Sequence, residues 1–307
     1  MNENWMRCKS DLHRTDLHRT CTLPAAMLAF AAMYKNFYGL REAPFNMTPD
    51  PQFLFLSRNH RMALEVLRFG IAERKGFMVI TGEIGAGKTT VCRALLRSLG
   101  PNTKTALILN PSLSDTQLLR AICDEFKLQP AKTTKKDLYD ALNAFLLREL
   151  AANHNVVLIV DEAQNLRPKA LEQIRLLSNF ETEKEKLLQI ILVGQPELAR
   201  LLQRDDLVQL KQRIALRQHI PPLAWEEVGD YIRHRLEVAG AGGRIGWADD
   251  ALLLVHRYSR GVPRLINVLC DKALLAGYVA ESLTIEADHV QRAIGDLEGA
   301  ELAAGVT

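Results

Sequence analysis

The chain of 307 residues is long enough to bury a sizeable core, and its 48% hydrophobic and 24% charged residues are ordinary for a soluble globular protein of about two domains. Its formal net charge of +3 neither requires nor excludes a nucleic-acid partner. Five scattered cysteines without a CxxC pair argue against a disulfide framework or a zinc site, and the lack of an apolar run of about 18 residues argues against a transmembrane helix.

The first part of the chain differs in character from the rest. Residues 11–20 are a tandem DLHRT repeat, and the apolar segment 23–33 follows basic residues in a pattern that imitates a targeting signal. We interpret residues 1–32 as a disordered stretch or an over-extended gene start, with translation beginning at Met33 or nearby. Residues 33–60 are rich in proline and aromatic residues, so we predict an irregular N-terminal arm whose aromatic side chains pack on the main domain.

A phosphate-binding motif follows a predicted helix. Residues 61–75 have apolar side chains at helical spacing, and the β-favouring run 77–80 comes next. It leads into TGEIGAGKTT at residues 81–90, where another helical pattern, 88–99, begins. The spacing GxxxxGK[ST] between a strand and a helix is that of a P-loop.

The residue types of this loop suit a nucleoside triphosphate. Glycines permit backbone conformations in which successive N–H groups surround phosphate oxygens, and the following helix directs its positive end at the same place. Lys88 supplies charge to the outer phosphates, and the Thr89 hydroxyl suits Mg²⁺. We therefore predict ATP and Mg²⁺ as cofactors, and one or more aromatic residues of the arm could border the adenine. The predicted nucleotide-binding residues are Gly82, Glu83, Ile84, Gly85, Ala86, Gly87, Lys88, Thr89 and Thr90.

The next elements indicate a parallel sheet, because its strands are continuous apolar runs. The run 106–109 ends at Asn110, and the run 156–160 ends at Asp161 and Glu162. Ligands of open α/β sheets bind at the carboxyl ends of the strands, and two adjacent carboxylates there are costly unless they serve a site. This is a Walker B pattern, in which we expect Asp161 to hold Mg²⁺ and Glu162 to orient or activate the attacking water.

The remaining patterns complete the sheet and add helices. The strand 187–193 is followed by Gln195, beside the Walker B edge, and the alternating strand 214–220 closes the sheet before Pro221 and Pro222. Helices are predicted at 116–126, 137–152, 168–180, 196–202, 207–211, 225–239, 249–258, 263–280 and 285–296. We predict an α/β fold, a P-loop NTPase with a five-stranded mainly parallel sheet flanked by helices, plus a C-terminal all-helical lid. The predicted divisions are an ATPase domain (61–221), a lid domain (222–298) and a flexible tail (299–307).

A family resemblance rests on several motifs. They are residues 38–40, 44–45 and 48–51 of the arm, TGEIGAGKTT, VDEAQNL at 160–166, VGQPEL at 193–198, LKQRI at 210–214 and GVPRLIN at 261–267. With them the chain resembles an AAA+ ATPase, and more closely the ATPase portion of the general secretion pathway protein A type, over residues 34–297. Members of that type usually continue into a transmembrane helix and a peptidoglycan-binding region, and neither property is carried over to this chain.

The resemblance implies roles for further residues. Arg213 matches the arginine-finger segment and would reach the γ-phosphate bound by a neighbouring subunit, and Arg264 matches sensor 2 in the lid. Gln195 matches sensor 1, and Asn110 matches the residue that holds the catalytic glutamate inactive. With Glu162 and Lys88, the residues Gln195, Arg213 and Arg264 form the predicted catalytic set.

The resemblance also implies partners. It predicts a homo-oligomer, either a ring or an ATP-dependent assembly, and a partner protein of a secretion, pilus or exopolysaccharide system. We expect a cytoplasmic location, peripheral to the inner membrane through that partner.

Two other functions stay open. Basic residues at 132–136 and 200–217 would suit an ATP-switched DNA-binding adaptor of the transposition-helper type, although solvated helix faces explain them equally well. A nucleotide-binding scaffold without turnover is disfavoured by Asp161 and Glu162.

Overall fold

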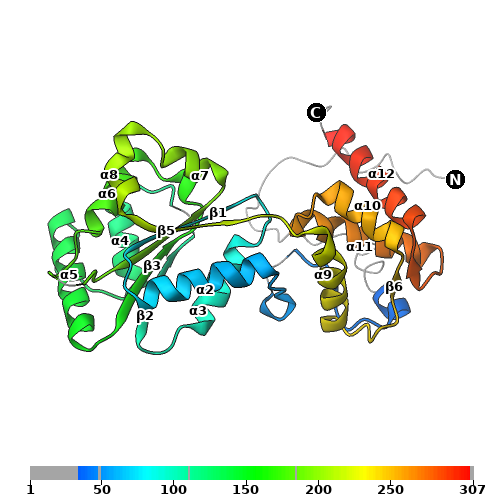
Figure 1. Cartoon of the computed structure of the whole chain (residues 1–307), viewed down its shortest axis with the longest axis horizontal. Coiled ribbons are helices and arrows are strands. Elements are labelled where there is room, and N and C mark those ends of the chain that lie inside the picture. The colour runs from blue at the N-terminus through cyan, green and yellow to red at the C-terminus, as the bar shows by residue number, and fades with distance from the viewer. Residues whose placement is uncertain (1–33, 48–49, 110, 184, 305–307) are drawn as a thin grey trace, which may run out of the picture.

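The computed structural model describes residues 34–47, 50–109, 111–183 and 185–304. The predictions for residues 1–32 and for Asn110 lie outside these ranges. The described chain forms two lobes, one built around a β-sheet and one built mainly of helices (Figure 1). Among the described residues, no helix has both the length and the hydropathy needed to cross a bilayer.

The sheet is parallel throughout and has the strand order β2-β3-β4-β1-β5. Its strands are β1 (Phe77–Gly82), β2 (Thr103–Ile108), β3 (Asn155–Val160), β4 (Gln189–Gly194) and β5 (Ile214–Ile220). All residues of β1 and β4 are buried, because helices cover both faces, and this explains their continuous apolar sequences. The five-stranded parallel sheet predicted from the sequence is confirmed.

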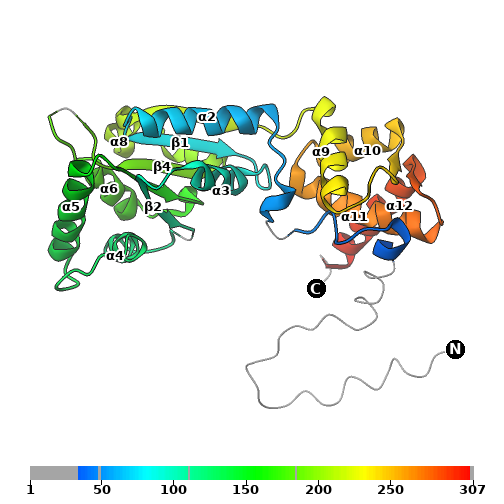
Figure 2. The same ribbon diagram turned by 90° about the horizontal axis from the view of Figure 1, so that it is seen from below.

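Two hydrophobic clusters lie on opposite faces of the sheet. Phe77 and Val79 enter one cluster, and Met78 and Ile80 enter the other, because successive strand residues point to opposite faces. The first cluster includes side chains of α4 (Asp115–Glu125), α5 (Lys135–Ala151) and α6 (Pro168–Leu177), and the second includes those of α2 (Arg58–Ala72) and α3 (Lys88–Ser98). Figure 2 shows the sheet between α2 and α4.

Helix boundaries follow local capping. Helix α2 begins at Arg58, before the predicted 61, because the Ser57 side chain accepts a hydrogen bond from the His60 N–H. Helix α4 begins with a capping box between Ser114 and Gln117. The short helices α7 (Pro196–Leu201) and α8 (Val208–Arg213) connect β4 to β5.

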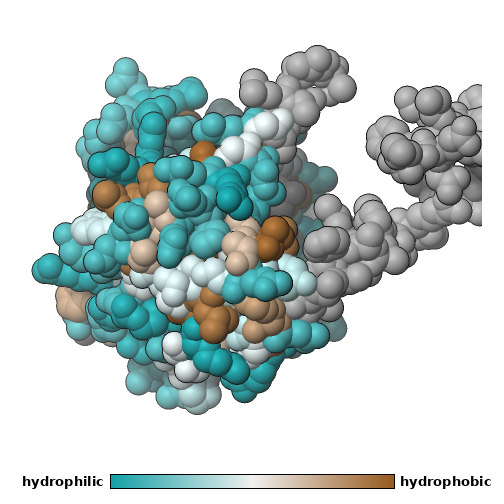
Figure 3. All heavy atoms as spheres, turned by 90° about the vertical axis from the view of Figure 1, so that its right-hand side faces the viewer, coloured by the Kyte–Doolittle hydropathy of each residue, from teal (hydrophilic) through white to brown (hydrophobic). Residues whose placement is uncertain are grey.

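The second lobe is helical with one short strand pairing. Its helices are α9 (Trp225–Val238), α10 (Asp249–Ser259), α11 (Pro263–Val279) and α12 (Ala287–Ala304). Strands β6 (Gly246–Trp247) and β7 (Thr284–Ile285) pair in parallel, which the prediction of an all-helical lid did not include. Helix α12 continues to Ala304, into the stretch that was predicted from residue 299 onward as a tail. The face of this lobe in Figure 3 is mainly hydrophilic, with small separate hydrophobic areas.

The aromatic side chains of the arm pack on the helical lobe, so their predicted packing on the main domain is wrong, whereas Leu54 and Leu56 of the arm pack against the sheet lobe. Residues 34–38 are helical, and Pro51–Phe53 form a 3₁₀ turn. The Tyr38 hydroxyl lies 3.1 Å from the Leu274 carbonyl oxygen, to which it donates. The buried arm side chains Tyr34, Tyr38, Leu40, Phe45 and Phe53 join a cluster with residues of α9 to α12. Aromatic composition predicts that these side chains are buried, but it does not indicate which lobe buries them.

Candidate functional site

The phosphate-binding loop connects β1 to α3. Gly85 and Gly87 have φ angles of 78° and 93°, in the left-handed region that disfavours other residues. Gly87 stands at the N-cap position of α3, so the predicted loop lies directly before the first turn of that helix. The backbone N–H groups of the loop and the dipole of α3 favour an anion at the N-terminus of this helix.

Lys88 is buried at the first position of α3. Its ammonium group donates hydrogen bonds of 2.9 Å to the carbonyl oxygens of Gly82 and Glu83. Burial lowers the pKa of Lys88 below its ordinary value, while the nearby carboxylates of Glu162 and Asp161 act in the opposite direction. A buried cation beside the glycine turn is suited to a bound anion.

Asp161, which directly follows β3, contacts the first turn of α3. Its Oδ2 atom accepts a 2.7 Å hydrogen bond from the Thr89 hydroxyl, and its Oδ1 atom accepts one of 2.9 Å from the Glu162 N–H. Asp161 is buried, and burying a carboxylate is costly unless it is paired or holds a metal ion. Thr89 and Asp161, both predicted to ligate a metal, are thus in direct contact across the two motifs.

Two amide side chains hold the Glu162 carboxylate. Gln195 Nε2 donates to Glu162 Oε2 at 3.2 Å, and Gln164 Nε2 donates to the same oxygen at 2.5 Å. Gln164 Oε1 in turn accepts the Gln195 N–H at 3.1 Å. The structure therefore brings Gln195 to the Walker B edge, as predicted. Sequence reasoning missed Gln164, whose only signal is its place in VDEAQNL.

Arg264 approaches the loop from the helical lobe. It lies in the first turn of α11, and a Cβ atom built on Gly85 would be 2.5 Å from the Arg264 Cβ. Gly85 is therefore required by this close contact as well as by its φ angle. The site is thus formed at the junction of the two lobes.

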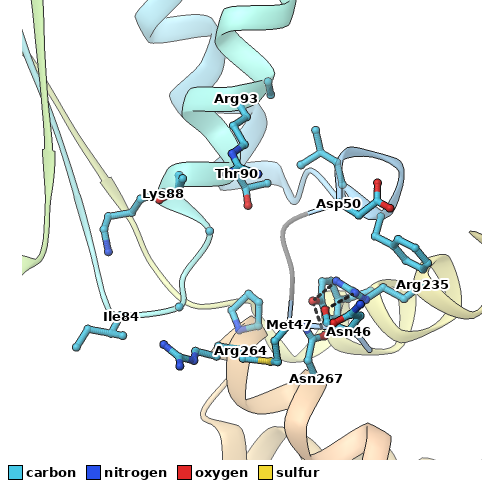
Figure 4. Close-up of a pocket in the computed structure, with 18 of the residues that line it drawn as sticks. Asn46, Met47, Asp50, Ile84, Lys88, Thr90, Arg93, Arg235, Arg264 and Asn267 are labelled. Carbon is cyan, nitrogen blue, oxygen red and sulfur yellow. Dashed lines mark hydrogen bonds between the residues drawn. The ribbon is translucent and has the colours of Figure 1, made fainter. Parts of the chain in front are cut away.

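A pocket of about 470 Å³ opens at this junction, between the loop, the arm and the helical lobe (Figure 4). Lys88, Thr89 and Thr90 line it from the loop and α3, and Arg264 lines it from α11. An apolar wall of Met47, Phe53, Leu54 and Tyr231 lies on the side of the arm and α9, where Asn46, Asp50 and Arg235 also line the pocket. Cationic and hydroxyl groups at the loop, with mixed apolar and polar side chains at the arm, suit a ligand with phosphates and a flat, hydrogen-bonding ring system.

Arg213 lies apart from this pocket. It is the last residue of α8, and it donates to Asn179 Oδ1 at 2.6 Å and to the Ser178 hydroxyl, both just after α6. In Figure 1, α6 and α8 lie at the end of the sheet lobe remote from the helical lobe. Within one chain, the structure does not bring Arg213 to the other predicted catalytic residues.

Comparisons with known proteins agree with this architecture. Residues 71–202 match the model of an AAA domain. The chain is 47% identical over 268 residues to general secretion pathway protein A of Aeromonas hydrophila, a match that covers 87% of this chain and 49% of the relative. The chain thus spans about half the length of that protein.

Solved structures with low identity share the fold. The Aeropyrum pernix ORC2 protein, in ADPNP–ADP complexes, is 17% identical with a TM-score of 0.60, covering 82% of this chain and 70% of that one. Drosophila ORC bound to DNA is 17% identical with a TM-score of 0.63, and the match covers 93% of this chain and 70% of that one. The Thermotoga maritima RuvB Holliday junction branch migration motor is 18% identical with a TM-score of 0.54, and the match covers 79% of this chain and 70% of that one.

Proposed function

We propose that the chain is a Mg²⁺-dependent AAA+ ATPase of the general secretion pathway protein A type, over the portion of that protein that it matches. The proposed role of hydrolysis is to drive or regulate a partner assembly. The observation that carries this proposal is the 2.7 Å contact between Thr89 of the loop and Asp161 at the end of β3. It joins a phosphate-binding loop and a carboxylate edge into one site.

The residues present fit ATP and Mg²⁺. The glycine turn and Lys88 suit the phosphates, and the apolar wall at Phe53 suits the adenine. Among the residues that the structure describes, no group of three or more His, Cys, Asp or Glu side chains could hold a metal alone. Thr89 and Asp161 are the groups that would hold Mg²⁺ together with phosphate oxygens, which is how Mg²⁺ is usually bound in nucleotide sites. When bound, Mg²⁺ would neutralise charge that develops on the phosphates.

Each catalytic residue has a defined role in this proposal. The Glu162 carboxylate orients the attacking water and accepts its proton, with Gln195 and Gln164 fixing the carboxylate in place. Lys88 and Arg264 compensate negative charge on the phosphates, the first from the loop and the second from the helical lobe. Closure of that lobe on the nucleotide would bring Arg264 to its working position.

Arg213 acts in a neighbouring subunit. Because it lies outside its own chain's pocket, its proposed role as arginine finger requires a homo-oligomer in which α8 of one subunit faces the site of the next. ATP would then be hydrolysed between subunits. The proposed partner is a protein of a secretion, pilus or exopolysaccharide system, and the cytoplasmic location stays a prediction.

A DNA-binding adaptor is less well supported. Several basic residues that motivated it are paired within the chain: Lys135 with Asp115 at 3.1 Å, Arg200 with Glu197 at 3.5 Å and Arg204 with Asp206 at 3.0 Å. Paired side chains leave less free positive charge for phosphate contacts. Salt-dependent binding to duplex DNA in the presence of ATP would reverse this preference.

The test compares two variants with the wild-type protein. Lys88→Ala should lose binding of a fluorescent ATP analogue, because the buried ammonium group is removed from the phosphate site. Glu162→Gln should bind the analogue normally and release no phosphate from ATP. A Glu162→Gln protein that turned over ATP at the wild-type rate would refute the assignment of Glu162 as the catalytic base.

A further inference from the structure

His60 connects α2 to the phosphate-binding loop. It lies in the first turn of α2, and its side chain is buried, with 3% of its surface exposed. Ring atom Nδ1 lies 2.7 Å from the Ser57 hydroxyl oxygen, and Nε2 lies 2.8 Å from the Ala86 carbonyl oxygen. Both ring nitrogens are therefore paired, one with the residue that caps α2 and one with the loop.

The partners fix the protonation of the ring. A carbonyl oxygen only accepts hydrogen bonds, so Nε2 carries the hydrogen that is donated to Ala86. Nδ1 then accepts the hydrogen of the Ser57 hydroxyl. Burial lowers the pKa of His60 below its ordinary value, which agrees with a neutral ring in this position.

The same ring packs against the glycine at the start of α3. A Cβ atom built on Gly87 would lie 2.6 Å from His60 Nε2, so the ring fills the space where a side chain would otherwise be. Gly87 has the φ angle of 93° that turns the chain into α3. Thus one side chain makes a hydrogen bond to residue 86 and a close contact with residue 87, immediately before Lys88.

We propose that His60 is a positioning residue that holds the phosphate-binding loop in its ATP-binding shape before the nucleotide arrives. This inference rests on the proposed ATP binding at the loop. The Ala86 carbonyl is bound to the imidazole, so this peptide group is fixed in one orientation. A loop fixed in advance loses less conformational freedom when it binds phosphate, and this raises affinity.

Two substitutions separate the contacts of the ring. The amide nitrogen of His60→Gln can reach the position of Nε2 and keep the bond to Ala86, whereas that of His60→Asn reaches only the position of Nδ1. Binding of a fluorescent ATP analogue with Mg²⁺ would be titrated for both, and thermal unfolding would be measured without nucleotide. We expect His60→Asn to weaken binding about tenfold and His60→Gln by less than about threefold, since a tenfold change corresponds to about 1.4 kcal/mol, which lies within the range for one intramolecular hydrogen bond.

The comparison distinguishes positioning from general stability. A purely structural role predicts that affinity follows the unfolding temperature, so that two variants of equal stability bind equally well. Equal affinity for His60→Asn and His60→Gln would overturn the proposal. If the wild-type protein itself bound no nucleotide, the proposed function would fail. If the wild-type protein bound the analogue and both variants bound it with the same affinity, only the proposed role of His60 would be refuted.

A milder variant covers the case in which His60→Asn does not fold. Ser57→Ala removes the donor to Nδ1 and frees the ring, so we expect ATP binding to weaken about threefold. Ser114→Ala is its matched control, because Ser114 caps α4, which packs on α5, β2 and α6. The proposal is wrong if Ser57→Ala binds ATP as tightly as Ser114→Ala does.

Discussion

At the scale of single residues, the hydrogen bond from Gln164 to Glu162 predicts an effect on the rate of ATP hydrolysis. Its amide nitrogen and the Gln195 amide nitrogen both donate to Glu162 Oε2. Gln164→Met keeps the length of the side chain but removes the donor, so the carboxylate is less well oriented. We expect kcat to fall by about tenfold to a hundredfold, because a hydrogen bond to a charged group is worth about 1.5–3 kcal/mol.

The kinetic parameters identify this role. Gln164 does not line the pocket, so ATP affinity should be unchanged in Gln164→Met. Steady-state phosphate release and analogue binding measure the two effects separately. Weaker ATP binding with an unchanged kcat would show that Gln164 supports the loop and does not position Glu162.

His60 also predicts a pH dependence of stability. Burial lowers its pKa in the folded state, and the Ala86 carbonyl and the Glu227 carboxylate of α9 oppose this shift only in part. The unfolded chain, with a histidine pKa of about 6.5, therefore binds more protons than the folded chain just below that pH. The neutral His60 ring therefore makes its full contribution to the free energy of unfolding above about pH 6.5. This contribution is lost as the pH falls through the lowered pKa that His60 has in the folded state.

The substitution His60→Gln removes this titration. The difference in unfolding free energy between the wild-type protein and His60→Gln should therefore shrink between about pH 7.5 and pH 5.5. Chemical denaturation at several pH values measures it. A difference that stayed constant over this range would show that His60 is not held neutral in the folded chain.

At the scale of elements, the arm and α9 form one unit through Arg235. This buried guanidinium donates to the carbonyl oxygens of Pro44 at 2.5 Å and Asn46 at 3.1 Å, and it lies 4.9 Å from the centre of the Phe53 ring. Arg235→Met leaves both carbonyl groups without these donors. We expect the free energy of unfolding to fall by about 2–4 kcal/mol, together with weaker ATP binding because Phe53 lines the pocket.

Arg233 provides the matched control on the same helix. It is exposed and pairs with Asp230 at 2.7 Å on the surface. Surface ion pairs contribute little to stability, so Arg233→Met should unfold and bind ATP like the wild-type protein. Equal effects of the two substitutions on unfolding would refute the assignment of Arg235 as the link between the arm and the lobe.

The elements that the sequence predicted well are those with a strong local signal. Strands such as β3 and β4 are buried on both faces, and their apolar runs are visible without any knowledge of the fold. The P-loop and Asp161 follow from spacing and from their place after a strand. The two-residue pairing of β6 and β7 could not be predicted, because it depends on contacts between distant segments.

The parts of the site that were missed depend on tertiary contacts. His60 is an ordinary histidine in an amphipathic helix until the fold places it beside Ala86. Gln164 gains its role from the position of Gln195 on another strand end. Polar residues of this kind carry no periodic pattern, so sequence reasoning cannot distinguish them from surface residues.

At the scale of the whole molecule, the position of Arg213 predicts complementation between subunits. A proposed complete site needs Glu162 from one chain and Arg213 from its neighbour. Arg213→Ala and Glu162→Gln should each abolish most ATP hydrolysis when measured alone. Mixed in equal amounts, they create interfaces in which an intact Glu162 faces an intact Arg213, so phosphate release should recover in part.

The control for this experiment is the double variant that carries both substitutions. Mixed with Arg213→Ala, it supplies no Arg213 to any interface, so recovery is not expected however well the subunits assemble. Light scattering with ATP present would confirm that each mixture forms the same oligomer. If the two single variants assembled together without any gain in hydrolysis, Arg213 would not act across the interface, and its contacts with Asn179 and Ser178 would then describe a structural role within one chain.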